Sequence, residues 1–576
     1  MQHLKFRLSG PRRPLFRRIQ QFIALLLVAA LAACTTGSPE YWLPPSAPPT
    51  AVPLAAGPAI ELPVAQPSPT ITSEPAALPL EAAATVDTSP LPENLPAAPA
   101  TATATLPPLV PTMAVPPTLP APAGPSLPTA TPEIYVVNSA PILYYAQAAD
   151  TLPVVAVRFG VRVDEISSPD PIPERSFINP GQLLIIPRRL ANTTSSQHLL
   201  PDSEVVYSPS AVGFDAREFA SLSGGYLNSF DEWHKSTSTQ SGASIIMRVA
   251  TENSVNPRLL LALLEYHSHW VYGQPETQDQ KDYPLGYNVP AHKGLYNQLI
   301  WAVNQLQTGY YAYREGRLTE IKFRDGLTTR LAPDLNAGTA ALQYYFAQMY
   351  DSRQWLQAVD PQAGLPALHT LMFGNPWERA QRVEPLFPSG ITQPQLILPF
   401  TKGWTWSYTG GPHGAWEQEG SLAALDFAPG ATEAGCTDSK AYATAAAAGL
   451  VVRTGPGLVV IDLDGDGHEQ TGWVLVNLHV AEKERVAVGT WLAAGDMIGK
   501  PSCEGGFATG THLHIARKFN GEWVPADGPL PFNLGGWIAQ RGVAPYKGTL
   551  TRDGVTLVAC TCSNYLTFIT RTDTDP

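Results

Sequence analysis

A proline-rich tract limits where this chain can fold. Residues 34–132 hold 26 of its 58 Pro and contain no Lys or Arg. The tract consists largely of Pro, Ala, Thr and Ser, and it cannot bury enough apolar surface to offset the entropy of ordering it. Pro-rich segments favour the polyproline II conformation, at about 3.1 Å per residue, so we expect a linker of up to about 300 Å. Folded domains are therefore predicted only after residue 132.

The first 33 residues have the features of an export signal. They contain six basic side chains and no acidic ones, and residues 22–33 form an apolar run. This run is too short to cross a hydrocarbon core of about 30 Å comfortably. A basic start, a short apolar run and small residues at its end are typical of a cleaved signal peptide, with an uncleaved anchor as the alternative. No second apolar run of 18 residues follows in the sequence.

The end of the signal contains the sequence Leu31-Ala32-Ala33-Cys34. It resembles the lipobox of bacterial lipoproteins, a resemblance that implies lipid attachment at Cys34. Each buried CH₂ of an acyl chain contributes about 0.8 kcal/mol to membrane binding, and stable anchoring needs two lipid signals. We expect an exported protein of the cell envelope, held by lipid at the outer face of a membrane.

Composition excludes two classes of protein. The formal net charge is −12 and the sequence has no basic stripe, so we expect no binding to nucleic acid. Five Cys in 576 residues are too few for a small domain built on disulfides.

Residues 133–190 have the pattern of a small α/β module. We expect a strand at 135–137, a helix over 150–161 that ends at Gly160, and a turn and strand over 179–187. These pieces resemble a LysM module, which implies binding to N-acetylglucosamine polymers. Ala149 replaces the usual Gly, and the segment 167–176 is longer than usual, so the fold is the stronger expectation.

Residues 200–390 are predicted to be helical, with helices that start after Asn256 and Asn336. This pair of helices resembles those of lysozyme-like lytic transglycosylases. Aligned on that family, His267 takes the place of the acid that cleaves the glycosidic bond, and a His cannot simply replace a carboxylic acid. Glu265 is rotated by about 200° on the helix and would face elsewhere. We therefore expect an all-α, lysozyme-like segment without glycan cleavage; the alternative is a generic helical domain with surface His267 and His269.

Histidines gather late in the chain, among short β-like runs and Gly turns that predict an antiparallel sheet. Because side chains alternate along a strand, His512 and His514 point to one face, about 7 Å apart. Two such imidazoles can share a site, one as a metal ligand and one beside the water bound to the metal. Zinc prefers tetrahedral N and O ligands, and catalytic zinc sites keep one position open.

Residues 396–545 resemble the lysostaphin/LytM-type zinc endopeptidases, which cut peptide bridges of peptidoglycan. The resemblance lies in the Val-Asn-Leu-His run of residues 476–479, in the Gly-rich run of residues 486–499 and in Thr-Gly-Thr-His-Leu-His at residues 509–514. It implies a mainly antiparallel-β metallopeptidase domain with Zn²⁺ as its cofactor.

Carried over by position, the resemblance makes His514, His413 and Asp426 the zinc ligands. Twelve residues separate His413 from Asp426, where the family has three, so we expect an inserted loop at 415–423. His512 and His479 become the catalytic residues, which orient a water, accept its proton and stabilise the oxyanion. Asp426 lies in an apolar strand, where an unpaired carboxylate would be costly to bury.

Two further features have open interpretations. The alternating acids of residues 462–469 resemble the start of a calcium loop, but Trp473 stands at the twelfth position, so a hairpin turn is favoured. Four other Cys permit three disulfide pairings, and a bridge at Cys503 would brace the loop before His512. These residues are Cys436, Cys503, Cys560 and Cys562.

The expected protein is multidomain. Signal peptide 1–33, linker 34–132, LysM module 133–190, helical domain 200–390 and peptidase domain 396–545 are followed by a C-terminal tail, 546–576. The expected function is hydrolysis of peptide bonds in peptidoglycan by a zinc-activated water, with peptidoglycan and the anchoring membrane as partners. The alternative is a non-catalytic peptidoglycan-binding or amidase-activating protein on the same fold.

Overall fold

The computed structural model describes residues 140–416, 419–430, 435–562, 565–573 and 575, which contain three hydrophobic cores. The export signal, Cys34, the proline-rich tract and the strand expected at 135–137 lie outside the described residues. Among the described residues, no helix combines the length and the apolar composition that crossing a membrane requires.

The first folded module is a two-stranded antiparallel sheet covered by one helix. Strand β1 (Ile142–Tyr145) pairs with β2 (Leu183–Ile186), and helix α2 (Leu152–Phe159) lies between them in the chain. As expected, Gly160 ends the helix in a left-handed conformation, with φ of +64°. The core contains a buried ion pair between Asp150 and Arg158, and Asp150 also accepts a hydrogen bond from the Tyr144 hydroxyl.

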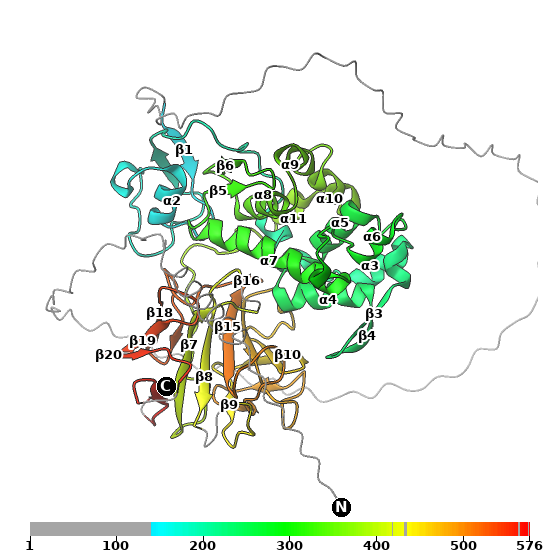
Figure 1. The fold of residues 1–576 in the computed structure, drawn as a ribbon. Helices are drawn as coiled ribbons and strands as arrows, with labels where there is room; N and C mark the ends of the chain where they lie inside the picture. Colours follow the sequence, from blue (N-terminus) through cyan, green and yellow to red (C-terminus); the bar gives the residue numbers. More distant parts are fainter. Residues whose placement is uncertain (1–139, 417–418, 431–434, 563–564, 574, 576) are drawn as a thin grey trace, which may run out of the picture. The chain divides into compact units, whose positions relative to one another are not determined.

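The next segment is mainly helical, as expected, but it also contains two short hairpins (Figure 1). Helix α5 is its centre, since every residue from Leu259 to Leu264 is fully buried. The expected helix starts are present, with Asn256 and Asn336 as the residues that precede α5 and α8. The helices are α3 (Ala216–Ser223), α4 (Gly242–Asn253), α5 (Pro257–Ser268), α6 (Gln278–Asp282), α7 (Leu295–Arg314), α8 (Ala337–Met349), α9 (Ser352–Ala358), α10 (Leu365–Phe373) and α11 (Pro376–Ala380). The hairpins are β3 (Asp231–His234) with β4 (Ser238–Ser241), and β5 (Glu320–Lys322) with β6 (Thr328–Arg330).

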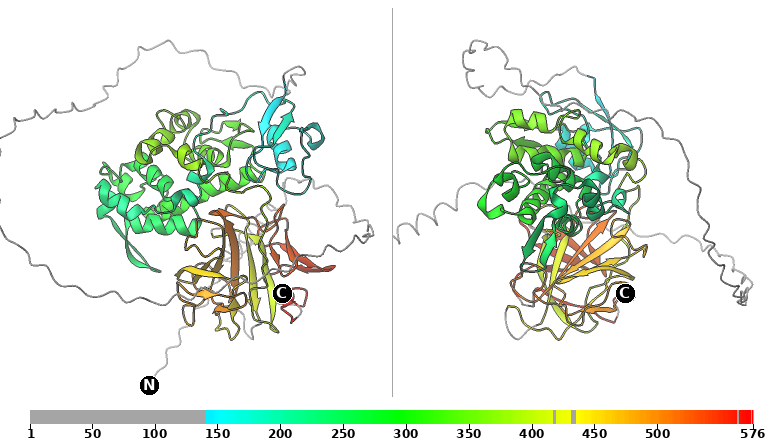
Figure 2. Two further views of the ribbon diagram at one scale, coloured as in Figure 1. Left: turned by 180° about the vertical axis from the view of Figure 1, so that it is seen from behind. Right: turned by 90° about the vertical axis from the view of Figure 1, so that its right-hand side faces the viewer.

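The C-terminal part is built from antiparallel sheets (Figure 2). The largest sheet has the order β13-β10-β11-β12-β15-β8-β7-β21, and β16 pairs with β15. Its strands are β7 (Thr405–His413), β8 (Ala424–Pro429), β10 (Gly449–Gly455), β11 (Leu458–Asp462), β12 (Trp473–Leu478), β13 (Trp491–Leu492), β15 (Leu513–Phe519), β16 (Glu522–Trp523) and β21 (Phe568–Thr570). A second sheet contains β17 (Asn533–Leu534), β18 (Trp537–Arg541), β19 (Gly548–Arg552) and β20 (Val555–Val558), and β9 (Ala443–Thr444) pairs with β14 (Met497–Gly499).

Residues 546–576 were expected to form a tail, but they contribute strands to the sheets of the β part. They supply β19, β20 and β21, and β21 pairs with β7 at the edge of the largest sheet. Apolar side chains such as Leu550 and Ile569 are buried in the core beneath that sheet, which explains why the segment folds onto it.

The two faces of the largest sheet pack against different partners. On β12 and β15, Leu475 and Ile515 point into the core of the β part, whereas Val476 and Ala516 pack into the core of the helical segment. His514 shares the face of Ala516, because side chains two positions apart on a strand point the same way. The candidate site therefore lies on the same face of the sheet as the helical segment. The helical segment packs against another part of that face, farther along the strands.

Candidate metal centre

The site is assembled where three neighbouring strands meet. Asp426 on β8 lies directly opposite His514 on β15 and opposite Gly410 on β7. His413 ends β7, after two irregularities in its pairing with β8. The loop expected between His413 and Asp426 therefore connects the two strands of a β-hairpin. Pairing of β7 with β8 brings the two residues together although twelve residues separate them in the sequence.

Three side chains bring ligand atoms to one point. Nε2 of His413 and Nδ1 of His514 lie 3.2 Å and 3.3 Å from Oδ1 of Asp426, and 3.0 Å from each other. The candidate ligand atoms of the three residues all lie within 4.8 Å of one another, and all three side chains are buried. This is the donor set, two imidazoles and one carboxylate, that zinc accepts.

Close packing at Gly410 positions the carboxylate. A Cβ at Gly410 would stand 2.4 Å from Oδ2 of Asp426, a distance that real side chains do not adopt. Only glycine therefore lets β7 approach Asp426 this closely.

His512 lies at the more open side of the site, and the buried ring of His479 lies beside it. Nε2 of His512 lies 3.8 Å from Oδ1 of Asp426, and its side chain is 16 % exposed. The rings of His479 and His512 are 4.3 Å apart between centroids. The sequence thus located five side chains that the fold brings together.

Backbone carbonyls orient the four imidazoles. Each ring donates one N–H to a carbonyl oxygen, which fixes the tautomer of the neutral ring. The second nitrogens of His413, His514 and His512 lie within 3.8 Å of Oδ1 of Asp426. The pairs are His413 Nδ1 with Gly411 at 2.7 Å, His514 Nε2 with Ala415 at 2.9 Å, His512 Nδ1 with Gly510 at 2.7 Å and His479 Nδ1 with Glu504 at 2.8 Å.

One polar atom has no hydrogen-bond partner of its own. Oδ1 of Asp426 has no solvent-exposed surface and accepts no hydrogen bond among the described residues. The imidazole nitrogens around it are positioned as lone-pair donors, so they cannot donate hydrogen bonds to it as neutral rings. A cation would stabilise a buried carboxylate oxygen among such lone pairs, so these residues fit a metal ion.

The electrostatics of the site favour a charged carboxylate among histidines. Burial raises the pKa of Asp426, but His413 and the neighbouring imidazoles outweigh burial and hold that pKa well below its usual range. Burial lowers the pKa of His413, whereas Asp426 raises it, and the balance is a raised pKa. Burial lowers the pKa of His514, and burial together with His512 lowers the pKa of His479 to about 4.

His479 is held in an uncommon backbone conformation. Its φ is +61°, in the left-handed region, immediately after β12. The backbone N–H and the hydroxyl of Ser502 both donate to its carbonyl, at 2.6 Å and 3.1 Å. Such strain persists only where the surrounding contacts enforce it, and here it directs the ring toward His512.

A disulfide ties the loop before His512 to the segment between β8 and β9. Cys436 pairs with Cys503, and Cys560 pairs with Cys562. This is one of the three pairings that the sequence left open. The Thr511 hydroxyl donates to the Thr437 carbonyl at 2.6 Å, close to the first bridge. The bridge at Cys503 thus braces the loop before His512, as expected.

Tyr546 belongs to the site, but no sequence motif pointed to it. Its ring stacks on His413, with centroids 4.1 Å apart and planes inclined by 20°. The residue is 43 % exposed and has a φ of +66° between β18 and β19. Its position in the segment expected as a tail explains why sequence reasoning missed it.

The other candidate positions have structural roles. Glu265 accepts hydrogen bonds from the N–H groups of Val271 and Tyr272, at 2.9 Å and 3.0 Å, so its carboxylate holds the chain after α5. His267 is half-buried, and the hydroxyls of Tyr345 and Tyr350 lie within hydrogen-bond distance of its two ring nitrogens, whereas His269 is exposed.

The acidic run after β11 is the loop of a hairpin, as favoured. Strands β11 and β12 pair antiparallel on its two sides. Asp462 accepts hydrogen bonds from the N–H groups of Asp464 and Gly467, at 3.2 Å and 2.9 Å. Its carboxylate thereby stabilises the turn, and His468 lies in this loop and not in the histidine cluster.

Comparison with known proteins finds similarity to part of the chain. Residues 198–386 match the family described as "LasA, N-terminal domain". The chain is 26 % identical to Protease LasA from two strains of Pseudomonas aeruginosa, over 298 and 299 residues, which cover 49 % of this chain and 68 % of each relative. The family match falls on the helical segment, and the lysozyme-like resemblance of that segment stays a prediction.

Two solved structures resemble smaller parts. The deep-sea M23 metalloprotease pseudoalterin is 21 % identical, with 30 % of this chain and 96 % of that chain covered and a TM-score of 0.25. Lysostaphin from Staphylococcus simulans is 17 % identical, with 29 % and 87 % covered and a TM-score of 0.15.

Proposed function

We propose that the β part of this chain is a zinc-dependent endopeptidase that hydrolyses peptide bonds of peptidoglycan. One observation supports the proposal above the others. Three imidazoles, those of His413, His514 and His512, are each oriented by a backbone carbonyl and place their second nitrogens 3.2, 3.3 and 3.8 Å from the buried, unpartnered Oδ1 of Asp426. The similarity to Protease LasA is consistent with peptidase activity.

Three residues have the role of metal ligands in this proposal: His413, Asp426 and His514. Their donor atoms already converge, so binding would require little rearrangement of the strands. A zinc ion held there would act as a Lewis acid that polarises a carbonyl and makes water a stronger acid.

His512 and His479 are the proposed proton-transfer residues. Each donates its Nδ1–H to a backbone carbonyl, which leaves Nε2 as an acceptor on the open side of the site. Nε2 of His512 can accept a proton from the attacking water and later donate it to the leaving amine. The pKa of His479, lowered by burial to about 4, keeps that ring neutral at pH 7.

Tyr546 is proposed to assist at the mouth of the site. Stacking on His413 fixes its ring, while its partial exposure leaves the hydroxyl accessible to a substrate. A phenol hydroxyl can donate a hydrogen bond to the negative charge that develops on a carbonyl oxygen under attack.

The other parts are proposed to place the enzyme at its substrate. Lipid on Cys34 would hold the protein at the outer face of a membrane, and the linker 34–132 would let it reach the cell wall. The module around α2 would bind the glycan strands. The domain limits proposed for this arrangement are 133–190, 200–390 and 396 onward, with the peptidase extending to the last strand.

The test uses the full-length protein with its metal content measured. We expect about one zinc per chain, release of free amino groups from purified peptidoglycan, loss of both on chelation, and recovery on addition of zinc. A protein that binds peptidoglycan but neither binds zinc nor releases amino groups would favour the non-catalytic, amidase-activating alternative.

A further inference from the structure

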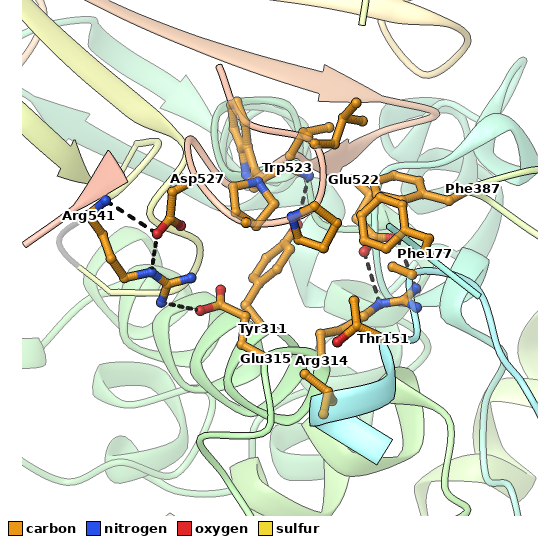
Figure 3. Close-up of a pocket in the computed structure, with 17 residues that line it drawn as sticks. Thr151, Phe177, Tyr311, Arg314, Glu315, Phe387, Glu522, Trp523, Asp527 and Arg541 are labelled. Carbon is orange, nitrogen blue, oxygen red and sulfur yellow. Dashed lines mark hydrogen bonds and ion pairs between the residues drawn. The ribbon is translucent and has the colours of Figure 1, made fainter. Parts of the chain in front are cut away.

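A cavity of about 130 Å³ lies where three parts of the chain meet (Figure 3). The small N-terminal module contributes Thr151 and Phe177, helix α7 contributes Tyr311, and the segment from β16 to β18 contributes Trp523 and Leu530. A cavity of this size holds a group about as large as a benzene ring, well beyond one water molecule.

Aromatic side chains form much of the wall. Tyr311, Phe387 and Trp523 are buried, and the ring of Phe177 lies 5.9 Å from that of Phe387 between centroids (Figure 3). Phe177 is half-buried and Pro529 is exposed, so the cavity opens to solvent on this side. Such a site suits one apolar group of a ligand whose remainder stays in water.

The charged side chains of the lining are paired with one another. Arg314 forms an ion pair with Glu522 at 2.9 Å, and Arg541 forms ion pairs with Glu315 at 2.9 Å and Asp527 at 2.6 Å. Both lining Arg are therefore engaged, and an acidic side chain of a ligand would gain little here. The Arg541 side chain is 34 % exposed, and its guanidinium has N–H groups beyond the two that make these pairs, so it can still donate to a carbonyl.

The chain itself contains a segment with matching chemistry. Residues 94–132 hold twelve Pro and no charged side chain, whereas residues 34–93 carry six acidic ones. Proline offers an apolar ring and a carbonyl but no backbone N–H, so it brings no donor that the lining must satisfy. Pro-rich segments dock on aromatic-lined sites, and their preformed polyproline II conformation keeps the entropic cost low.

We propose that this cavity binds a proline ring from residues 94–132 of the same chain. The described chain begins at residue 140, and Ala149 and Thr151 in the module that follows line the cavity. The tract thus joins the folded chain close in sequence to one wall of the site. Such a tether keeps the local concentration of the segment at about a millimolar, so a weak intrinsic affinity is enough for docking.

Photo-cross-linking of the full-length protein tests the docking. Leu530→p-benzoyl-phenylalanine places a photoreactive group at the half-buried lining, and mass spectrometry identifies the segment joined to it. We expect cross-links to residues 94–132 at least about tenfold more often than from the same group at Leu356, which is 63 % exposed on α9. Equal yields from the two positions, or cross-links mainly to lipid or to a second copy of the chain, would overturn the proposal.

Proline variants identify the docking part of the tract. Changing the twelve Pro of residues 94–132 to Ala should lower the cross-links from position 530 to the level of the Leu356 control. Changing the fourteen Pro of residues 34–93 to Ala is the matched control and should leave these cross-links unchanged. Cross-links that persist in the first variant would show that proline is not the docked group.

A second probe leaves the cavity unaltered. Photo-methionine incorporated in place of Met puts a small photoreactive group at Met113, within the uncharged part of the tract, and none of the six Met lines the cavity. We expect cross-links from position 113 to concentrate on residues 523–530. Cross-links from position 113 that spread over the exposed surface, or that exclude residues 523–530, would contradict docking at this cavity.

Discussion

His413 and Asp426 stand 3.2 Å apart across the hairpin of β7 and β8, from Nε2 to Oδ1. Their separation in sequence would place them far apart on an extended chain. The antiparallel register brings them together, since Gly410 lies opposite Asp426 and His413 opposite Ala424. The proposed metal site therefore depends on how closely the two strands approach.

Gly410→Ala tests this close approach. The added Cβ would lie 2.4 Å from Oδ2 of Asp426, so the carboxylate or the strand must move. We expect at least about a tenfold loss of zinc affinity, the size of effect typical for a displaced partner at a metal site. Equilibrium dialysis with zinc measures it. Gly430→Ala is the control, because its Cβ would meet nothing closer than 4.0 Å. Equal affinities in the two variants would contradict the packing argument.

The two disulfides should contribute unequally to stability. Cys436 and Cys503 are 67 positions apart, so their bridge removes a large loop entropy from the unfolded chain, worth about 4 kcal/mol. Cys560 and Cys562 are 2 positions apart, which predicts less than about 2 kcal/mol. Denaturant titration of the two double Cys→Ser variants measures both effects. A larger loss from the second pair would refute this ranking.

Stability of the helical segment should fall in acid because of His267. Burial lowers the pKa of this ring to about 3 in the folded chain, whereas an unfolded His has a pKa of about 6.5. Between these values the unfolded chain binds one more proton, so stability decreases as pH falls, by at most about 1.4 kcal/mol per pH unit. Full stability is present above about pH 6.5.

His267→Gln should flatten this pH dependence, as followed by thermal unfolding between pH 7 and pH 4. His269→Asn provides the control, because His269 is the exposed C-cap residue of α5 and has the positive φ that Asn tolerates. An unchanged slope in His267→Gln would assign the acid sensitivity to other groups.

Tyr546→Phe should slow hydrolysis and spare the metal. The ring can still stack on His413, so zinc content should stay at the wild-type level. Loss of the hydroxyl should lower kcat by about tenfold to a thousandfold, with little change in KM, if it acts on the developing charge. Tyr565→Phe, at a residue 78 % exposed, is the control. A kcat unchanged in Tyr546→Phe would remove this residue from the mechanism.

Sequence reasoning located the site better than its surroundings. His512 and His514 could be predicted from the sequence because strand periodicity puts them on one face, and His479 follows a recognisable apolar strand. Tyr546 could not be predicted from the sequence, because its contact with His413 depends on how β18 and β19 pack beside β7. The strands of residues 546–576 were missed for a similar reason, since β21 gains its partner only from β7 at the far end of the domain.

The most direct test of the metal centre measures zinc stoichiometry and peptidoglycan hydrolysis together in four Ala variants. We expect His514→Ala and Asp426→Ala to lose zinc and activity together, because each removes a ligand. His512→Ala and His479→Ala should keep zinc, while turnover falls by about 10²–10⁴-fold, as expected for the loss of a proton-transfer group. Full zinc and full activity in Asp426→Ala, or no zinc in the wild-type protein, would contradict a zinc-dependent peptidase built on these residues.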